Sequence, residues 1–458
     1  GMLPSVPAGY KVTNTPEPIP GGNPAIASYF LGNGMAIMGS GFARQGWNLD
    51  SAITTNVELV GAFKTAFPTT KKVLAWGSSL GGIITQTLAE KYPTLVDAVA
   101  PMCMADNISA ELTAAGDVLW GIKTFFDPTI KGGNYSAGAA GAGEAITDLV
   151  KMFTVIGKLQ ASISTNAWPD TSKAPDSIKA IPPRSALLLV GLMAGIPTKS
   201  TSFDSTTGPE GALKLTWPLA IAPAMAVLEN GAQGAALAIL ATHDLELQAG
   251  GAFYDNSKTD YAARVADEAV TFNAALSGNT ALNGLLSYLS PLNPAAPRLT
   301  ANQAALAKLR ALSTHTGKIS VPTVVLAGET DVVSPAGNTQ WLIDRYAEQS
   351  AAEKAAARKA DGGSFKAPKN KLIVIWKTGS SSYSKFTAAG SPDLNAAVGA
   401  GTGHCLYTSA QWLAAAKMIA AAVNTGKFPT QGPITTAAKK VGLSYDKKFR
   451  VPTFKSLA

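Results

Sequence analysis

The sequence contains a serine, Ser79, that has a glycine two residues before it and another two residues after it, in the run GSSLG (77–81). The preceding run, KKVLAWGS (71–78), predicts a strand, and SLGGIITQTLAEKY (79–92) predicts a helix. A G-x-S-x-G run between a strand and a helix is typical of a strained turn that exposes the serine hydroxyl. The N–H of Leu80 would then lie at the amino end of the helix, where it can stabilise an oxyanion. We expect Ser79 to be a nucleophile; the alternative is a glycine-rich turn whose serines only cap the helix.

A serine hydroxyl becomes an effective nucleophile when a base takes its proton. The chain has three histidines, His243, His315 and His404. His404 lies in GAGTGHC (399–405), a glycine-rich loop between the last predicted strand and the last predicted helix, and it is our candidate base. His243 lies in a helical region and His315 precedes a strand, so both are expected to be surface or packing residues.

The candidate acid is Asp331, which follows the β-branched run VPTVVLAGE (321–329). A carboxylate at the end of a buried strand can accept the imidazole N–H, fix its tautomer and stabilise the imidazolium. Glu329 is the alternative, but it is still at the strand end and is expected to point away.

Strand and helix signals alternate in two separate parts of the chain, 1–103 and 321–458. Such alternation is typical of a mostly parallel sheet flanked by helices, which is an α/β fold. The segment after Gly426 is rich in Pro, Lys and Thr and is expected to lie along the surface. Strands are expected at 35–42, 71–78, 95–103, 321–329 and 371–379, and helices at 51–67, 79–92, 335–348 and 409–422.

The region between these two parts, 104–320, has few strand signals and predicts a mostly helical insertion. It is too long to be a plain connection between two strands. Its two most apolar runs, 186–197 and 219–228, are shorter than the ~20 residues of a membrane helix and are interpreted as buried helices. Further helices are expected at 144–160, 211–240, 260–275 and 301–312.

Composition excludes several classes of function. With 46% hydrophobic and 15% charged residues, the 458-residue chain is typical of a soluble globular protein with a large core and no membrane span. The net charge of +8 is spread out, and the densest basic run, 354–371, holds one aromatic residue, Phe365, so a solvated surface is favoured over a nucleic-acid site. CxxC, HExxH and P-loop motifs are absent, so we expect no metal and no organic cofactor. The first residues show no signal segment.

The two cysteines are expected to lie near the candidate site, because Cys103 ends a predicted strand and Cys405 directly follows His404. A disulfide between them would anchor the histidine loop; two buried free thiols are the alternative. A disulfide would favour an extracellular or periplasmic location, where such bonds persist.

These features together resemble the α/β-hydrolase superfamily, in which the triad follows the chain order serine, aspartate, histidine. More narrowly, the sequence is similar to secreted bacterial esterases near the tannase/feruloyl esterase and prolyl-oligopeptidase-like groups. The resemblance implies hydrolysis of an ester or amide through an acyl-enzyme on Ser79, with Asp331 and His404 completing a triad, no cofactor, and the helical insertion as a lid or cap. A small-molecule or oligomeric ester is the implied substrate. The residues that carry the resemblance are GMAIMGSGFARQGW (34–47), KKVLAWGSSLGGIITQTLAEKYP (71–93), DAVAPMC (97–103), VPTVVLAGETDVVSP (321–335) and GHC (403–405), in roughly half of the chain.

The sequence departs from that superfamily near its start. Such folds have earlier strands and a His-Gly loop that supplies a second oxyanion donor, and 6–30 contains no apolar run followed by His-Gly. Phe42 and Trp47 are candidates to line a substrate pocket, with core packing as the alternative. Aromatic residues of the insertion are candidates either to contact a bulky substrate or to pack within a lid: Trp120, Trp168, Trp217 and Tyr254.

Two other functions stay open at this stage. A peptidase or amidase of the prolyl-oligopeptidase-like type would use the same triad, although the chain has no propeller-like repeat to gate peptides. A catalytically impaired hydrolase scaffold used for binding is favoured by the missing His-Gly loop. The sequence gives no indication of the oligomeric state.

Overall fold

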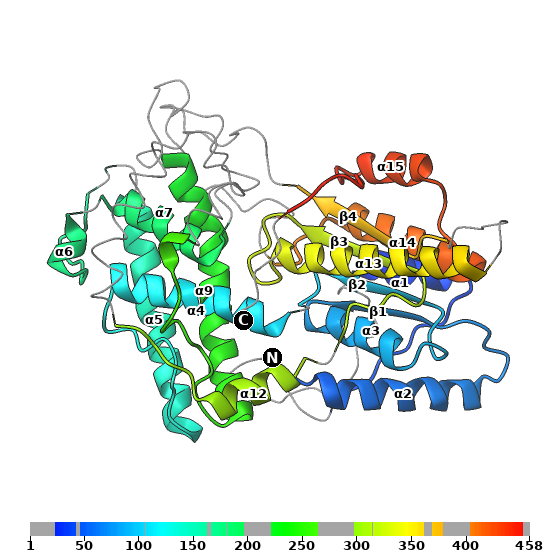
Figure 1. The fold of residues 1–458 in the computed structure, drawn as a ribbon, viewed down its shortest axis with the longest axis horizontal. Helices are drawn as coiled ribbons and strands as arrows, with labels where there is room; N and C mark the ends of the chain where they lie inside the picture. Colours follow the sequence, from blue (N-terminus) through cyan, green and yellow to red (C-terminus); the bar gives the residue numbers. More distant parts are fainter. Residues whose placement is uncertain are drawn as a thin grey trace.

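The computed structural model describes residues 23–42, 46–105, 107–162, 165, 167–180, 182–196, 221–263, 297–313, 315–360, 369–378 and 404–451. Its centre is a sheet of four parallel strands that follow one another in chain order (Figure 1). The sheet and its flanking helices confirm the prediction of a parallel α/β fold. The strands are β1 (Leu74–Ser78), β2 (Ala98–Met102), β3 (Thr323–Gly328) and β4 (Leu372–Lys377).

The two strands β2 and β3 are buried along their whole length, and β1 is half-buried at every residue. The run TVVLAG of β3 is apolar without alternation, as expected for a parallel strand covered on both faces. The lower burial of β1 follows from its position, since β2 is its one partner among the described strands.

Helices cover both faces of the sheet. One face packs against α2 (Leu49–Ala66), α3 (Leu80–Lys91) and α13 (Ala336–Ala360). The opposite face packs against α1 (Pro24–Gly32), α14 (Ser409–Thr425) and α15 (Gln431–Lys439). The helices predicted at 51–67, 79–92, 335–348 and 409–422 are therefore confirmed as α2, α3, α13 and α14, with α13 longer than expected.

The strand expected at 35–42 is not formed, and this prediction was wrong. The segment has the side-chain alternation of a strand, because Ile37 packs on the α14 side of the sheet and Met38 packs on the α3 side. However, β1 forms its ladder with β2 and not with this segment. A short apolar run suggests a strand, whereas strand pairing depends on backbone hydrogen bonds that such a run does not encode.

The described residues between β2 and β3 form a block of helices beside the sheet, on the left of Figure 1. The helix α9 is central, because α4, α5, α7 and α12 all contact it. Most of the helix predicted at 260–275 lies outside the described residues. The block consists of α4 (Ile108–Phe125), α5 (Gly138–Ser162), α6 (Asp176–Lys179), α7 (Pro183–Ala194), α9 (Ile221–Ala249) and α12 (Gln303–Ala311).

Trp47 connects the helical block to the α/β part. Its backbone N–H donates to the Asp244 carboxylate of α9 at 2.9 Å, and its indole N–H donates to the Leu312 carbonyl at 2.9 Å. Gly46, with φ 75, must be a glycine, because a Cβ there would lie 2.4 Å from the Asp244 carboxylate. One cluster of buried apolar side chains runs from the helical block to the α3 side of the sheet.

Within the described ranges, none of the helices combines the length and the apolar character that crossing a membrane requires. The segment after Gly426 contains a helix, α15, that the sequence analysis did not predict. Two side chains of α15, Ile434 and Ala438, are buried against the α14 side of the sheet.

Candidate active site

Ser79 occupies the turn between β1 and α3, with φ 58 and ψ −124. A positive φ is strained for a residue that carries a Cβ, as expected for a G-x-S-x-G turn. The turn is attached to the end of β2: the Ser79 N–H donates to the Met102 carbonyl at 3.0 Å, and the Ser79 carbonyl accepts from Ala105 at 3.3 Å. The neighbouring strand therefore holds the strained backbone in place.

The glycines around Ser79 have different roles. A Cβ on Gly77 would lie 2.0 Å from the Gly81 carbonyl oxygen, so glycine is required at position 77. A Cβ on Gly81 would meet open space, so close packing does not require a glycine at position 81. The close approach is instead at Gly82, where a Cβ would lie 3.0 Å from the Met104 Cα.

Three side chains that are far apart in the sequence meet at the carboxyl ends of the strands. The Nε2 atom of His404 lies 2.6 Å from the Ser79 Oγ, and its Nδ1 atom lies 3.0 Å from one carboxylate oxygen of Asp331 and 3.2 Å from the other. The Asp331 side chain is 1% exposed and the His404 side chain is 17% exposed. A substrate can thus reach the imidazole while the carboxylate stays shielded from solvent.

The Asp331 carboxylate has further donors that fix its orientation. The backbone N–H groups of Val333 and Ser334 donate to one of its oxygens at 3.0 and 2.9 Å. These contacts are those of an Asx-type turn, which the run DVVS after the strand could have indicated. Glu329, the alternative acid, is also buried, but it is Asp331 that contacts His404.

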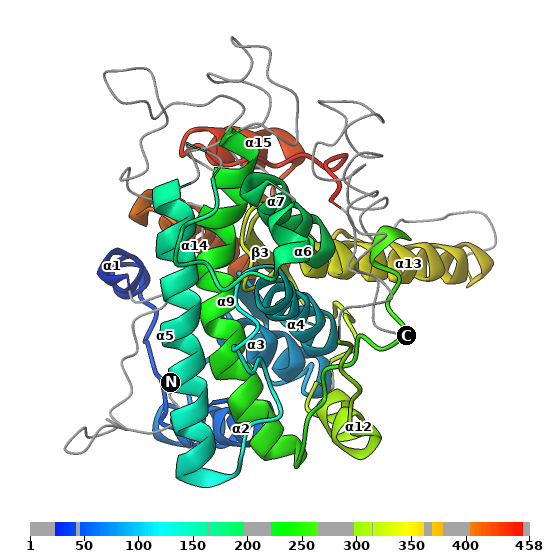
Figure 2. The ribbon, with the colours of Figure 1, turned by 90° about the vertical axis from the view of Figure 1, so that its left-hand side faces the viewer.

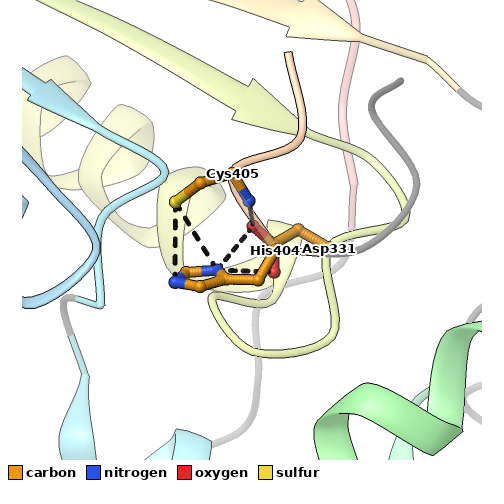
Figure 3. A group of neighbouring side chains, drawn as sticks. All are labelled: Asp331, His404 and Cys405. Carbon is orange, nitrogen blue, oxygen red and sulfur yellow. Dashed lines mark hydrogen bonds and ion pairs between the residues drawn. The ribbon is translucent and has the colours of Figure 1, made fainter. Parts of the chain in front are cut away.

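The disulfide between Cys103 and Cys405 joins the end of β2 to the residue after His404, with the two Cα atoms 5.5 Å apart. In Figure 3 the imidazole lies between the Asp331 carboxylate and the Cys405 sulfur. Among the described residues, one group has possible ligand atoms near enough to one another to hold a metal ion: Asp331, His404 and Cys405. The disulfide occupies the sulfur, so Cys405 offers no thiolate ligand.

Helix α14 fixes the other end of the histidine loop. It begins with a capping box, in which the Thr408 side chain accepts from the Gln411 N–H and the Gln411 side chain accepts from the Thr408 N–H. The hydroxyl of Tyr407 is buried nearby. Burial, followed by the negative charge of Asp331, holds the Tyr407 pKa well above its ordinary value, so this side chain is neutral. Tyr407 could not be singled out from the sequence, because its distance from Asp331 along the chain gives no sign that the two side chains lie close together.

The two other histidines lie away from Ser79, in packed surroundings. His243 is buried in α9 with its ring 6.0 Å from the Tyr135 ring, and burial lowers its pKa. His315 packs edge-on against Trp341 at 5.2 Å, and burial lowers its pKa to about 4. The structure brings neither of them to the Ser79–His404–Asp331 group.

Leu80 is the first residue of α3, so its N–H has no acceptor within the helix and is available to a ligand. Phe42 is half-buried and packs against the same cluster as Leu80. Trp47 is buried, and its contacts to α9 and Leu312 are those of a packing residue.

Three of the four aromatic residues singled out in 104–320 have packing contacts inside the helical block. Trp120 stacks on Tyr261 at 4.8 Å, Trp168 packs on Phe126 at 5.5 Å, and the Tyr254 hydroxyl donates to Asp117 at 2.7 Å. Position 217 lies outside the described residues.

A small pocket lies where the helical block meets the loop after β3. Its walls include Glu329 and Asp331 from that loop and small residues of the helices, such as Ala115 of α4 and Gly234 of α9. The pocket is mostly apolar and adjoins the backbone that carries the acid.

The arrangement can move a proton. With a carboxylate at Nδ1, the N–H of the neutral ring is placed at Nδ1, which leaves the Nε2 lone pair facing the serine hydroxyl. The Nε2 atom can then accept the Ser79 proton, and Asp331 stabilises the imidazolium that results.

No family model matches the chain, and no curated protein matches it. Among solved structures it is similar to an esterase from Aspergillus oryzae, with 11% identity and a TM-score of 0.29 over 74% of this chain and 56% of that chain. It is also similar to feruloyl esterase B from Aspergillus oryzae, with 12% identity and a TM-score of 0.29 over 88% of this chain and 72% of that chain. The chain thus spans little more than half of the first of these esterases, and similarities at this level carry no argument about its function.

Proposed function

We propose that this protein is a serine hydrolase of the α/β-hydrolase type that cleaves a carboxylic ester through an acyl-enzyme. The observation that carries the proposal is the chain of contacts from the Ser79 Oγ to His404 at 2.6 Å and from His404 to Asp331 at 3.0 Å. A packing cluster has no need for a strained serine, a partly exposed imidazole and a buried carboxylate in this order.

The first step is acylation. His404 takes the proton of Ser79 as the serine oxygen attacks the ester carbonyl, and the carbonyl oxygen becomes an oxyanion. The Leu80 N–H, at the positive end of α3, is the donor that stabilises this oxyanion. His404 then gives its proton to the departing alcohol, which leaves the acyl group on Ser79.

The second step is hydrolysis of the acyl-enzyme. His404 takes a proton from water, the hydroxide equivalent attacks the acyl carbonyl, and the proton returns to Ser79 as the acid is released. The Asp331 carboxylate keeps its position throughout, because the backbone N–H groups of Val333 and Ser334 also donate to it. No cofactor takes part in this sequence.

The helical region 104–320 would act as a cap over a core made of 1–103 and 321–458. This division is supported by the pocket between the loop after β3 and helices α4, α7 and α9. The substrate of the proposed reaction is a small ester or the end of an oligomeric one. The Cys103–Cys405 disulfide supports an extracellular or periplasmic location.

The test is hydrolysis of p-nitrophenyl acetate and butyrate by the purified chain and two serine variants. Ser79→Ala is expected to lower kcat/KM by roughly a thousandfold or more. The matched control Ser78→Ala, one residue earlier in the same run, is expected to leave kcat/KM within about twofold. Equal rates for wild type and Ser79→Ala, or an equal loss in both variants, would remove the proposed role of Ser79.

A further inference from the structure

Helix α5 is apolar on two opposite faces. The buried face, which includes Ala145, Met152 and Val155, packs into the helical block. The opposite face carries Ile146, Val150 and Phe153, which are 47%, 61% and 54% exposed. We call these three residues the outward stripe. A surface helix of a soluble protein usually places polar residues on its solvent side, so the outward stripe needs an explanation.

The outward stripe is one continuous surface. Its residues follow the spacing i, i+4, i+7, which places them on one side of the helix. Figure 2 shows α5 in front of α9, on the side of the helical block that is turned away from the sheet. The stripe is therefore remote from the Ser79 site, and substrate binding there does not account for it.

A shallow groove continues the outward stripe on one side. Val150 belongs to both, and the groove also contains Trp168 and Pro169 from the segment after α5. Three lysines, which we call the lysine flank, line the same groove: Lys151, Lys158 and Lys173.

Two of the three residues of the lysine flank form no ion pair among the described residues. The ammonium groups of Lys151 and Lys158 donate to backbone carbonyls, of Thr129 and Thr171, and neither is paired with a carboxylate among the described residues. Lys173 pairs with Asp127 at 3.2 Å. Apolar side chains next to unpaired lysines are the features of a helix that lies in the headgroup region of a lipid surface, where anionic lipids attract the charge.

A second copy of the chain fits this surface less well. In a two-fold contact with antiparallel α5 helices the outward stripe would meet itself, and the lysine flanks of the two copies would lie on the same edge of the contact. The chain also carries a net charge of +8, which opposes self-association.

We propose that the outward stripe and the lysine flank of α5 form a docking surface for an anionic lipid bilayer. Docking is peripheral and reversible: the apolar side chains enter the headgroup region and the lysines contact anionic headgroups. It does not depend on the proposed hydrolase activity.

The experiment is co-sedimentation of the full chain with vesicles of phosphatidylcholine alone or mixed with phosphatidylglycerol. Wild type is expected to bind the anionic vesicles and to be released by salt. Val150→Gln with Phe153→Gln is expected to weaken binding roughly tenfold. Glutamine is a good helix former, so α5 itself should persist. Lys151→Gln with Lys158→Gln is expected to weaken binding to anionic vesicles by roughly 30-fold and to leave binding to phosphatidylcholine unchanged.

The matched control is Phe67→Gln, because Phe67 is 56% exposed at the end of α2, outside the helical block. It is expected to bind vesicles as wild type does. Failure of wild type to bind either vesicle, or an equal loss in the control, overturns the proposal. So does a dimer, seen by sedimentation velocity, that the Val150→Gln and Phe153→Gln changes dissociate, since a second copy would then occupy the stripe.

Discussion

The imidazole of His404 has a different partner at each nitrogen, and this division defines its chemistry. The carboxylate of Asp331 accepts from Nδ1, while Nε2 faces the Ser79 hydroxyl. If the proton of the neutral ring were on Nε2 instead, an N–H would face the serine and could not take its proton. In the proposed mechanism the tautomer of this ring therefore decides whether Ser79 is activated, and the buried acid fixes the tautomer.

A second histidine gives a prediction about stability. The Nε2 atom of His315 is buried without a hydrogen-bond partner, and burial lowers its pKa from 6.5 to about 4. The unfolded chain therefore binds more protons than the folded chain between pH 6.5 and 4, so stability is lost as the pH falls through this range. Wild type should lose about 2 kcal/mol from this residue between pH 7.5 and pH 5.

The measurement is denaturant unfolding of wild type and His315→Phe at several pH values. Phenylalanine keeps an aromatic ring against Trp341 and removes the titrating group. The variant should therefore show a smaller loss of stability between pH 7.5 and pH 5. Identical pH dependence in the two proteins would contradict the assignment.

The sequence predicted which residues meet at the candidate site better than it predicted their surroundings. Ser79, Asp331 and His404 could each be found from a short local pattern at the end of a predicted strand. The proximity of Tyr407 to Asp331 depends on how two loops pack, and no local pattern encodes that distance. Trp47, a candidate for the pocket, is instead a packing residue that bonds to α9.

At the scale of elements, the turn between β1 and α3 depends on one glycine of its motif. Gly77→Ala would place a Cβ 2.0 Å from a backbone oxygen, and backbone cannot move away cheaply. We expect it to lower stability by about 3 kcal/mol, with loss of any activity. Gly81→Ala meets open space and replaces a glycine in the first turn of α3, so its stability should match or exceed that of wild type. Thermal unfolding of both variants tests this, and equal destabilisation would refute the steric argument.

The disulfide ties two elements together, because it links the end of β2 to the loop that carries His404. Reduction should destabilise the protein by about 2–5 kcal/mol and release the histidine loop. We expect dithiothreitol to lower the denaturation midpoint of wild type, and to have no further effect on a Cys103→Ala and Cys405→Ala double variant. An unchanged midpoint after complete reduction, verified by thiol titration, would contradict this role.

Elements with strong local signals were predicted well, and those that depend on partners were not. The β-branched runs of β3 and β4 predicted buried strands, because no other element accommodates them as readily. Residues 35–42 also suggested a strand but form no ladder with β1, and α15 was missed because Pro, Lys and Thr suggested an irregular segment. In α15 tertiary packing of Ile434 and Ala438 outweighs weak helix propensity.

At the scale of the whole molecule, one apolar cluster crosses the boundary between the helical block and the α/β part. It includes Leu188 and Ile239 of the block together with Ile83 and Val325 beside the sheet. Shared burial of this kind couples the two regions, so we expect calorimetry to show one unfolding transition. Leu188→Ala, at a fully buried position, should cost about 2–5 kcal/mol and shift that whole transition. Two transitions, of which only one moves, would show that the regions unfold separately.

The way in which distant segments pack together in the whole molecule was the hardest feature to predict from the sequence. The pocket beside Asp331 combines residues of α4, α7 and α9 with the loop after β3, and their separation in the chain leaves no periodic signal. The exposed apolar face of α5 could not be predicted for a similar reason. An apolar residue in a helix is expected to be buried, and only the positions of the neighbouring elements show that it is exposed.

Covalent labelling of the purified chain by a fluorophosphonate probe, mapped by mass spectrometry, tests the central claim most directly. Such a probe phosphonylates a serine whose proton is taken by a neighbouring base. The account predicts one label on Ser79, with labelling abolished in His404→Ala. An unlabelled wild-type chain, or a label on any other serine, would contradict it.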